Sequence, residues 1–290
     1  MSRERALRQH LRALHTLDEA VGALRSLSAQ HFRSARALLP AARAYRDEVA
    51  AVLGVLGPGG DLVDAEPGPP TGIVLVAADL GLVGDYTGRL VHEALTFRAE
   101  KGPGPLFCLG SRAVGSLQGA GVQPVHAHPA PASVASLTRL LLPLVDEILT
   151  LRGAGELGAL WLVAARFEGA GRFQPVRARL LPVAAPSDAL RVAPSPYVDL
   201  RHLQRVVVRE HLYATLTESL LEALASEHGK RLVVAESARS WLAERIEATH
   251  RRAAALRREA STQEVLEVAT SARAARGLRR QGGGAWAQRS

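Results

Sequence analysis

The sequence predicts an α/β protein in which N- and C-terminal helices form a long antiparallel coiled coil, with a small α/β domain inserted between them in the chain. Two observations come from periodicity: apolar residues recur at helical spacing near both ends of the 290-residue chain, and short β-type runs alternate with helical runs between them. The third is that Pro- and Gly-rich stretches separate the middle from the ends. Together these patterns favour a domain inserted between the arms of a helical pair.

The N-terminal coiled-coil helix is expected over residues 1–56. One row of residues recurs every seven positions, and a second row fills the spaces between. The first row is Leu7, Leu14, Val21, Ser28 and Ala35, and the second is Leu11, Leu17, Leu24, Phe32 and Leu38. So narrow a stripe is typical of a helix that lies along another helix. Pro40 predicts a bend, and residues 57–71 a linker.

The α/β domain is expected over residues 72–184 and is Rossmann-like in its alternation of strand and helix. Its predicted strands are 73–77, 105–109, 122–126, 159–165 and 173–183, and its predicted helices are 85–100, 111–119 and 132–151. This order predicts a parallel or mixed sheet. A polar, Pro-rich linker is expected over 185–201.

The C-terminal coiled-coil helix is expected over residues 202–276, because this stretch has no proline and Gly229 is its only glycine before Gly277. A single helix of that length would span about 110 Å, so it needs a partner along its side. The apolar stripe consists of Val206, Leu212, Leu216, Leu220, Leu224, Val233, Leu242, Ile246, Leu256, Val265 and Val268. Residues 277–290 are expected to be a disordered tail.

The net charge of +8 is concentrated in the two terminal segments, whereas the middle is slightly acidic. Such asymmetry suits a nucleic acid, an anionic membrane or an acidic protein partner. Cys108 is the only cysteine, which excludes a disulfide within the chain. No apolar run approaches the length of a membrane span, and the first residues lack a signal-type apolar core.

The residues predict no catalytic group, no cofactor and no metal. Gly81 and Gly84 follow a predicted strand, but no Gly-x-Gly-x-x-Gly and no Gly-Lys-Ser/Thr accompanies them, so a tight turn is favoured over a nucleotide site. His126-x-His128 is a paired histidine spacing, but Pro129 follows it and no Cys or acid is near in sequence. We therefore interpret the pair as loop composition.

Three segments resemble the gamma subunit of F-type ATP synthases. Residues 79–86, Asp-Leu-Gly-Leu-Val-Gly-Asp-Tyr, are similar to the family's Asp-x-Gly-Leu-x-Gly-x-Tyr/Phe-Asn turn, with Thr87 where Asn is usual. Residues 225–235 are similar to its Ser-Glu-x-x-x-Arg-Met-x-Ala run, and 262–268 to its Ile-Thr-x-Glu-Leu/Ile-x-Glu-Ile run. The resemblance covers residues 2–276 and assigns Asp79, Gly81 and Gly84 to the turn motif.

The resemblance implies a rotor without an active site of its own. In that family the gamma coiled coil turns inside a ring of three alpha and three beta subunits, and its α/β domain contacts the epsilon subunit and the c ring. Catalysis belongs to beta, and gamma couples ion flow through the c ring to ATP synthesis or hydrolysis. The implied location is peripheral, on the cytoplasmic face of the bacterial inner membrane.

The resemblance also implies coupling residues, and most of them have an ordinary structural alternative. Leu24 stands where the family has Met in a Lys-Ala-Met stretch, and its structural alternative is a residue of the coiled-coil seam. Arg231 matches the Arg of the second segment, and its structural alternative is an ion pair with an acid of the seam. Nearer the C-terminus, the candidates are Arg257 and Arg258, which stand where the family has Arg-Gln, and Thr262 and Glu264, for which a solvated helix face is the alternative. Gly22, Thr87 and Arg258 depart from the family pattern. These departures suggest a divergent member, one hypothesis being the sodium-type gamma of an alternative operon.

Two other classes of function stay open at the sequence level. A basic coiled-coil nucleic-acid-binding or scaffold protein would use the same charge, but would need exposed aromatics or a recognised module, and neither is evident. A nucleotide-dependent enzyme built on the α/β domain predicts thermal stabilisation by ATP.

Overall fold

The computed structural model describes residues 2–56, 70–169, 171–183 and 199–284; within the two long helices, side chains are described from residue 5 and up to residue 273. Contacts divide the chain into two compact units. The larger unit comprises residues 24–236, and the smaller comprises 1–23 and 237–290. The expected linker residues 57–69 and 184–198 and the last six residues of the expected tail, 285–290, lie outside the described residues.

Helix α1 (Ser2–Leu56) and helix α5 (Leu200–Gly284) contribute to both units. Side-chain pairs between α1 and α5 show how the two helices are oriented. Within each unit, residues further along α1 contact residues that come earlier in α5. In the larger unit these pairs are Arg25–Glu236, Arg43–Glu222 and Tyr45–Glu210, and in the smaller unit they are Asp18–Arg239 and His15–His250. The two helices therefore run antiparallel in both units, as the sequence predicts.

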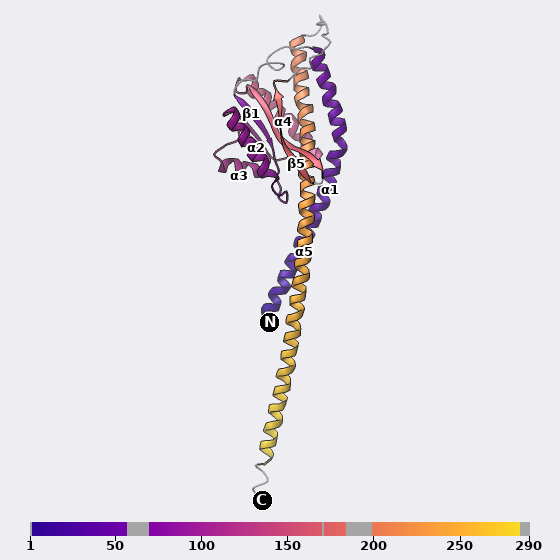
Figure 1. Ribbon diagram of the computed structural model, residues 1–290, viewed down its shortest axis with the longest axis vertical. Coiled ribbons are helices and arrows are strands. Elements are labelled where there is room, and N and C mark those ends of the chain that lie inside the picture. Colours follow the sequence, from indigo (N-terminus) through magenta and orange to yellow (C-terminus); the bar gives the residue numbers. More distant parts are fainter. Residues whose placement is uncertain (1, 57–69, 170, 184–198, 285–290) are drawn as a thin grey trace. The chain divides into compact units, whose positions relative to one another are not determined.

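The inserted domain contains one mixed five-stranded sheet with the strand order β3-β2-β1-β4-β5. Its strands are β1 (Thr71–Val76), β2 (Leu106–Leu109), β3 (His126–His128), β4 (Ala159–Gly169) and β5 (Arg172–Leu181). The first four strands in this order pair parallel, and β5 pairs antiparallel with β4. The predicted α/β class is confirmed (Figure 1).

Helices cover both faces of this sheet. They are α2 (Tyr86–Lys101), α3 (Ser111–Gly119) and α4 (Val134–Gly153). Along β1, Ile73 and Leu75 pack in the cluster that contains α2 and α3, whereas Val74 and Val76 pack in the cluster with α4, α1 and α5. Alternation along a strand sends successive side chains to opposite faces, so a strand buried on both faces is apolar throughout.

The predicted stripe on α1 is correct in one row and partly wrong in the other. In the seven-residue row, Leu14, Ser28 and Ala35 are buried. In the second row, Leu17 and Leu38 are exposed. Leu39 is buried in place of Leu38, because it lies four residues after Ala35 and therefore on the same helix face.

The third strand is shorter and lies further along the chain than predicted. A strand was expected over 122–126, but β3 is His126–His128. Pro124 has no N–H to donate, and the N–H of Val122 instead donates to the Leu117 carbonyl at the end of α3. Only from Val125 onward, whose N–H donates to Leu106 O, is the segment bonded to β2.

The C-terminal helix, unlike the N-terminal one, has boundaries that differ from those expected. Helix α1 continues through Pro40 as far as Leu56. Helix α5 begins at Leu200 and ends at Gly284, so residues 277–284 are helical where a disordered tail was expected. Residues 278–281 are good helix formers, and the glycine run that follows them is the first strong breaker. Among the described residues, no helix is long and apolar enough to cross a membrane.

Candidate functional site

Arg231 joins helix α5 to the turn that follows β1. It is fully buried, with 0% of its surface exposed. Its Nε donates to Gly81 O at 3.1 Å and its Nη2 to Leu80 O at 3.4 Å, and the guanidinium also pairs with Glu227 one helical turn away. The predicted turn motif and the predicted Arg231 therefore meet at one buried junction, which we call the Arg231 junction.

Burial shapes the electrostatics of this junction. It raises the pKa of Glu227, against the opposing effect of the Arg231 charge. Burial, together with Arg231 and His31, lowers the pKa of His228 to about 4, which keeps this imidazole neutral. The neutral ring fits its contacts, because Nδ1 accepts from Arg231 at 3.2 Å and Nε2 then donates to Ala132 O at 3.4 Å.

The turn itself is fixed at both ends. Asp79 Oδ1 accepts hydrogen bonds from the backbone N–H and the hydroxyl of Ser111, at 2.6 and 2.9 Å, and so caps the first turn of α3. Gly84 has φ +58°, the left-handed region that favours glycine. Next to it, Lys230 Nζ lies 3.0 Å from Asp85 Oδ1, and this hydrogen bond lowers the pKa of Asp85. The motif thus positions α2, α3 and α5 relative to one another.

The hairpin between β4 and β5 packs against the same stretch of α5. A Cβ on Gly229 would lie 2.9 Å from Phe167 Cε2, and a Cβ on Gly171 would lie 2.9 Å from Gly229 O. Phe167 also meets Phe32 of α1 edge to face, with ring centroids 5.3 Å apart. Gly229, to which the sequence assigns no role, lies where the helix and the hairpin approach each other closely.

Thr87, one of the departures from the family pattern, has a buried hydroxyl that makes no hydrogen bond within the described part of the chain. Leu24 is half-buried at the start of the larger unit. In the smaller unit, a Cβ on Gly22 would lie 4.0 Å from Arg239 Nε, so a side chain there would be accommodated.

The remaining predicted residues lie on one exposed stretch of α5, in the smaller unit. Every described side chain from residue 257 to residue 273 is exposed. This stretch includes Arg257, Arg258, Thr262 and Glu264, and the apolar residues Val265, Leu266 and Val268, which are 65%, 59% and 64% exposed. The Thr262 hydroxyl donates to Arg258 O at 2.9 Å, so it is engaged in its own helix.

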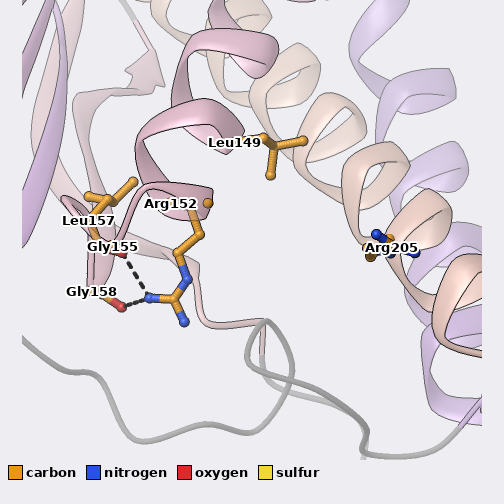
Figure 2. Close-up of a pocket in the computed structure, with 7 residues that line it drawn as sticks. Leu149, Arg152, Gly155, Leu157, Gly158 and Arg205 are labelled. Atoms are coloured by element: carbon orange, nitrogen blue, oxygen red, sulfur yellow. Dashed lines mark hydrogen bonds between the residues drawn. The ribbon is translucent and has the colours of Figure 1, made fainter.

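A pocket of about 530 Å³ lies where α4 ends beside α5 (Figure 2). Arg152 Nη1 points at the backbone, where it donates to Leu157 O at 2.9 Å and to Gly158 O. The lining is otherwise leucine, glycine and the exposed Arg205. Among the described residues, this lining supplies neither a carboxylate nor a nucleophile, and the Arg152 guanidinium is held by backbone carbonyls.

The histidine pair needs a correction. His126 and His128 lie on strand β3, not in a loop, and Glu147 of α4 lies against both of them. Sequence spacing could not reveal this acid, because the fold alone brings α4 beside the strand.

These features define a class of protein: an antiparallel helical pair carrying an inserted α/β domain, with a buried arginine joining the two and a long exposed helix end. Similarity to known proteins agrees with this description. The family described as ATP synthase matches residues 3–275, and the chain belongs to that family.

The curated relatives are gamma chains of ATP synthase. The chain is 29% identical over 288 residues to that of Moorella thermoacetica, covering 94% of this chain and 99% of the relative. It is 26% identical to that of Symbiobacterium thermophilum, with the same coverage.

Solved structures show the same fold. A chain of the Euglena gracilis mitochondrial ATP synthase, in a structure of OSCP, F1 and the c-ring in rotational state 3, matches with a TM-score of 0.60 and 11% identity over 94% of each chain. A chain of the Tetrahymena thermophila mitochondrial ATP synthase central stalk and c-ring matches with a TM-score of 0.56 and 14% identity, covering 76% of this chain and 99% of that one.

Proposed function

We propose that this chain is the central-stalk rotor subunit of a membrane ATP synthase. It couples ion flow through a c ring to ATP synthesis or hydrolysis in a ring of alpha and beta subunits. The observation that carries the proposal is the family match across residues 3–275, on a fold whose antiparallel helices and inserted domain are those of central-stalk chains. It is a non-catalytic subunit, and the nucleotide chemistry belongs to its partners.

The exposed end of α5 is the surface that faces the alpha–beta ring. Val265, Leu266 and Val268 would leave apolar area in water on an isolated chain, and a close-fitting ring removes that area from solvent. Arg257 and Arg258 place two positive charges on the same stretch. Guanidinium groups suit acidic loops on a ring subunit, because their fixed donors match carboxylate geometry.

The Arg231 junction serves a different purpose in this proposal. A rotor must carry torque between its inserted domain, which contacts the c ring and epsilon, and its helical pair. Arg231 has no exposed surface, so it acts inside the chain, by holding the turn at Gly81 against α5. Leu24, which is half-buried, is proposed as a contact along the helical pair.

We place the protein at the cytoplasmic face of a bacterial inner membrane, attached through its complex. The basic termini and the absence of a membrane-spanning helix among the described residues are compatible with this peripheral position.

Co-expression with the alpha, beta and epsilon subunits encoded in the same genome tests the proposal. A stable complex with ATPase activity that depends on this chain is the expected result. If the chain purifies alone and instead binds DNA in a salt-sensitive manner, the rotor proposal fails and the nucleic-acid alternative replaces it.

A further inference from the structure

The edge strand β3 presents two imidazoles on one face of the sheet. His126 and His128 are two residues apart on a strand, so their side chains project to the same side. Their rings are nearly parallel, at 6° with centroids 6.5 Å apart. In the parallel register they stand beside Phe107 and Leu109, whose side chains lie in the core cluster that contains α4.

Glu147 of α4 closes this arrangement from the other side. Its Oε2 lies 3.4 Å from His126 Nδ1 and 2.9 Å from His128 Nε2. One candidate ligand atom from each of the three residues falls in a group whose members all lie within 4.8 Å of one another. In a tetrahedral zinc site with bonds of about 2.0–2.1 Å, neighbouring ligand atoms lie about 3.3–3.4 Å apart. The cluster is therefore close to the size of a metal site.

The three side chains are held in place by their surroundings. The His126 ring stacks on the fully buried Phe107 ring, at 10° with centroids 5.4 Å apart. The neighbouring acid on α4, Asp146, is engaged elsewhere, because its Oδ1 lies 2.7 Å from Arg209 Nη2 of α5. Glu147 is thus the acid directed at the histidines. The side chains of the three are 23–34% exposed, which leaves water access to one side of the cluster.

We propose that His126, His128 and Glu147 form a binding site for a divalent first-row transition-metal ion, with Zn²⁺ as the ion best suited to two imidazoles and one carboxylate. Three protein ligands of this kind leave a fourth position, which water would fill on the exposed side. An oxygen-preferring ion such as Mg²⁺ fits poorly, since two of the three ligands are nitrogens.

The ion would cross-link the edge strand β3 to helix α4. Strand β3 has only three residues and pairs with a single neighbour, β2. A metal bond from each histidine and one from Glu147 would fasten this edge strand to α4. Because the ion binds the folded cluster and not the unfolded chain, binding would raise the unfolding temperature of the chain.

Metal titration of the full-length chain, stripped with a chelator that is then removed, tests the site. ZnCl₂ in calorimetry should bind saturably at one ion per chain, and Co²⁺ should give the visible absorption of a four-coordinate complex. His126→Ala, His128→Ala and Glu147→Gln should each weaken binding by about tenfold or more, because each removes or impairs a direct ligand. Zn²⁺ should raise the melting temperature of the unmodified chain and not of these variants.

Three control variants keep the experiment specific. Asp146→Asn alters the adjacent acid, His92→Ala removes an exposed histidine of α2, and His15→Ala breaks the His15–His250 ring pair of the other unit. All three should bind Zn²⁺ as the unmodified chain does. The proposal is overturned if no saturable binding occurs, if the three cluster variants bind as tightly as the unmodified chain, or if His15→Ala abolishes binding while they retain it.

Discussion

The contacts of Arg231 in the structure go beyond those that its sequence motif predicts. The sequence offers two roles for it, a coupling contact or a partner for a seam acid, and the structure gives it both Glu227 and the carbonyls of Gly81 and Leu80. A buried charge is stable only when it is paired and its donors are used. The segment around residue 231 and the turn at residue 81 are far apart in sequence, so spacing could not predict that they meet.

Replacing Arg231 should therefore be costly. Arg231→Met leaves Glu227 buried without its partner, and should lower the free energy of unfolding by about 3–5 kcal/mol. Arg239→Ala, which breaks the half-exposed Arg239–Asp18 pair, should cost only about 0–1 kcal/mol. Urea unfolding of the isolated chain measures both values. If Arg231→Met lowers the free energy of unfolding no more than the small amount expected for Arg239→Ala, the Arg231 junction does not stabilise the fold.

His228 predicts a specific pH dependence. Its pKa is lowered to about 4 in the folded chain, below the ordinary value of about 6.5, so the unfolded chain binds the proton first as pH falls. This contribution to stability is complete above pH 6.5 and is lost as pH falls toward 4. The raised pKa of Glu227 acts in the opposite direction, because the folded chain holds that proton more tightly.

Comparison with His228→Gln isolates the histidine, since both proteins keep Glu227 and Gln can still accept from Arg231. The stability advantage of the unmodified chain over the variant should shrink by roughly 3 kcal/mol between pH 7 and pH 4. Denaturant unfolding across that range measures it, and two parallel stability curves would rule out this role.

Among the elements, long periodic helices are predictable from local sequence and short strands are not. The patterns of α1 and α5 predict an antiparallel pair, and paired side chains confirm it in each unit. Strand β3 was misplaced because Val122 and Val125 carry an apolar signal, whereas Pro124 and the end of α3 decide the pairing. The proposed site at His126, His128 and Glu147 could not be predicted, because only the fold brings Glu147 of α4 beside this strand.

The hairpin between β4 and β5 should tolerate no side chain where it touches α5. Gly171 has φ +69°, and a Cβ there would lie 2.5 Å from Val233 Cγ2. Gly155 has a similar φ of +78° with nothing within 4 Å of its Cβ position, so it is a matched control. Gly155→Ala should cost about 1–2 kcal/mol from the left-handed backbone alone, and Gly171→Ala about 2–5 kcal/mol with the added crowding. Equal costs in thermal or urea unfolding would argue against close packing at this position.

The exposed end of α5 should matter for coupling and not for folding. Replacing Arg257, Arg258, Thr262 and Glu264 together by Ala should leave the unfolding free energy of the isolated chain within about 0.5 kcal/mol. It should, however, reduce ion pumping per ATP hydrolysed in the assembled complex. The matched control replaces Glu247 and Arg251, an exposed ion pair on the same helix. If the two variants pump the same number of ions per ATP hydrolysed, these four residues do not contribute to coupling.

We propose that the whole chain turns as a rotor. Family membership rests on residues 3–275, and the fold matches chains of two mitochondrial ATP synthase structures at 11–14% identity. Periodicity alone predicts the helical pair, but neither periodicity nor fold shows motion. The Arg231 junction matters here because torque passes between domain and helices only if the two are firmly joined.

Single-molecule rotation measures whether the chain turns within its complex. The complex of this chain with its alpha and beta subunits would be fixed to a surface through beta, with a bead attached to the exposed Gln118 of α3 after its replacement by cysteine; Cys108, being buried, should not compete for the label. We expect unidirectional rotation of the bead on addition of ATP, in three steps per turn for a ring of three catalytic subunits. A complex that hydrolyses ATP while the bead stays still would contradict it.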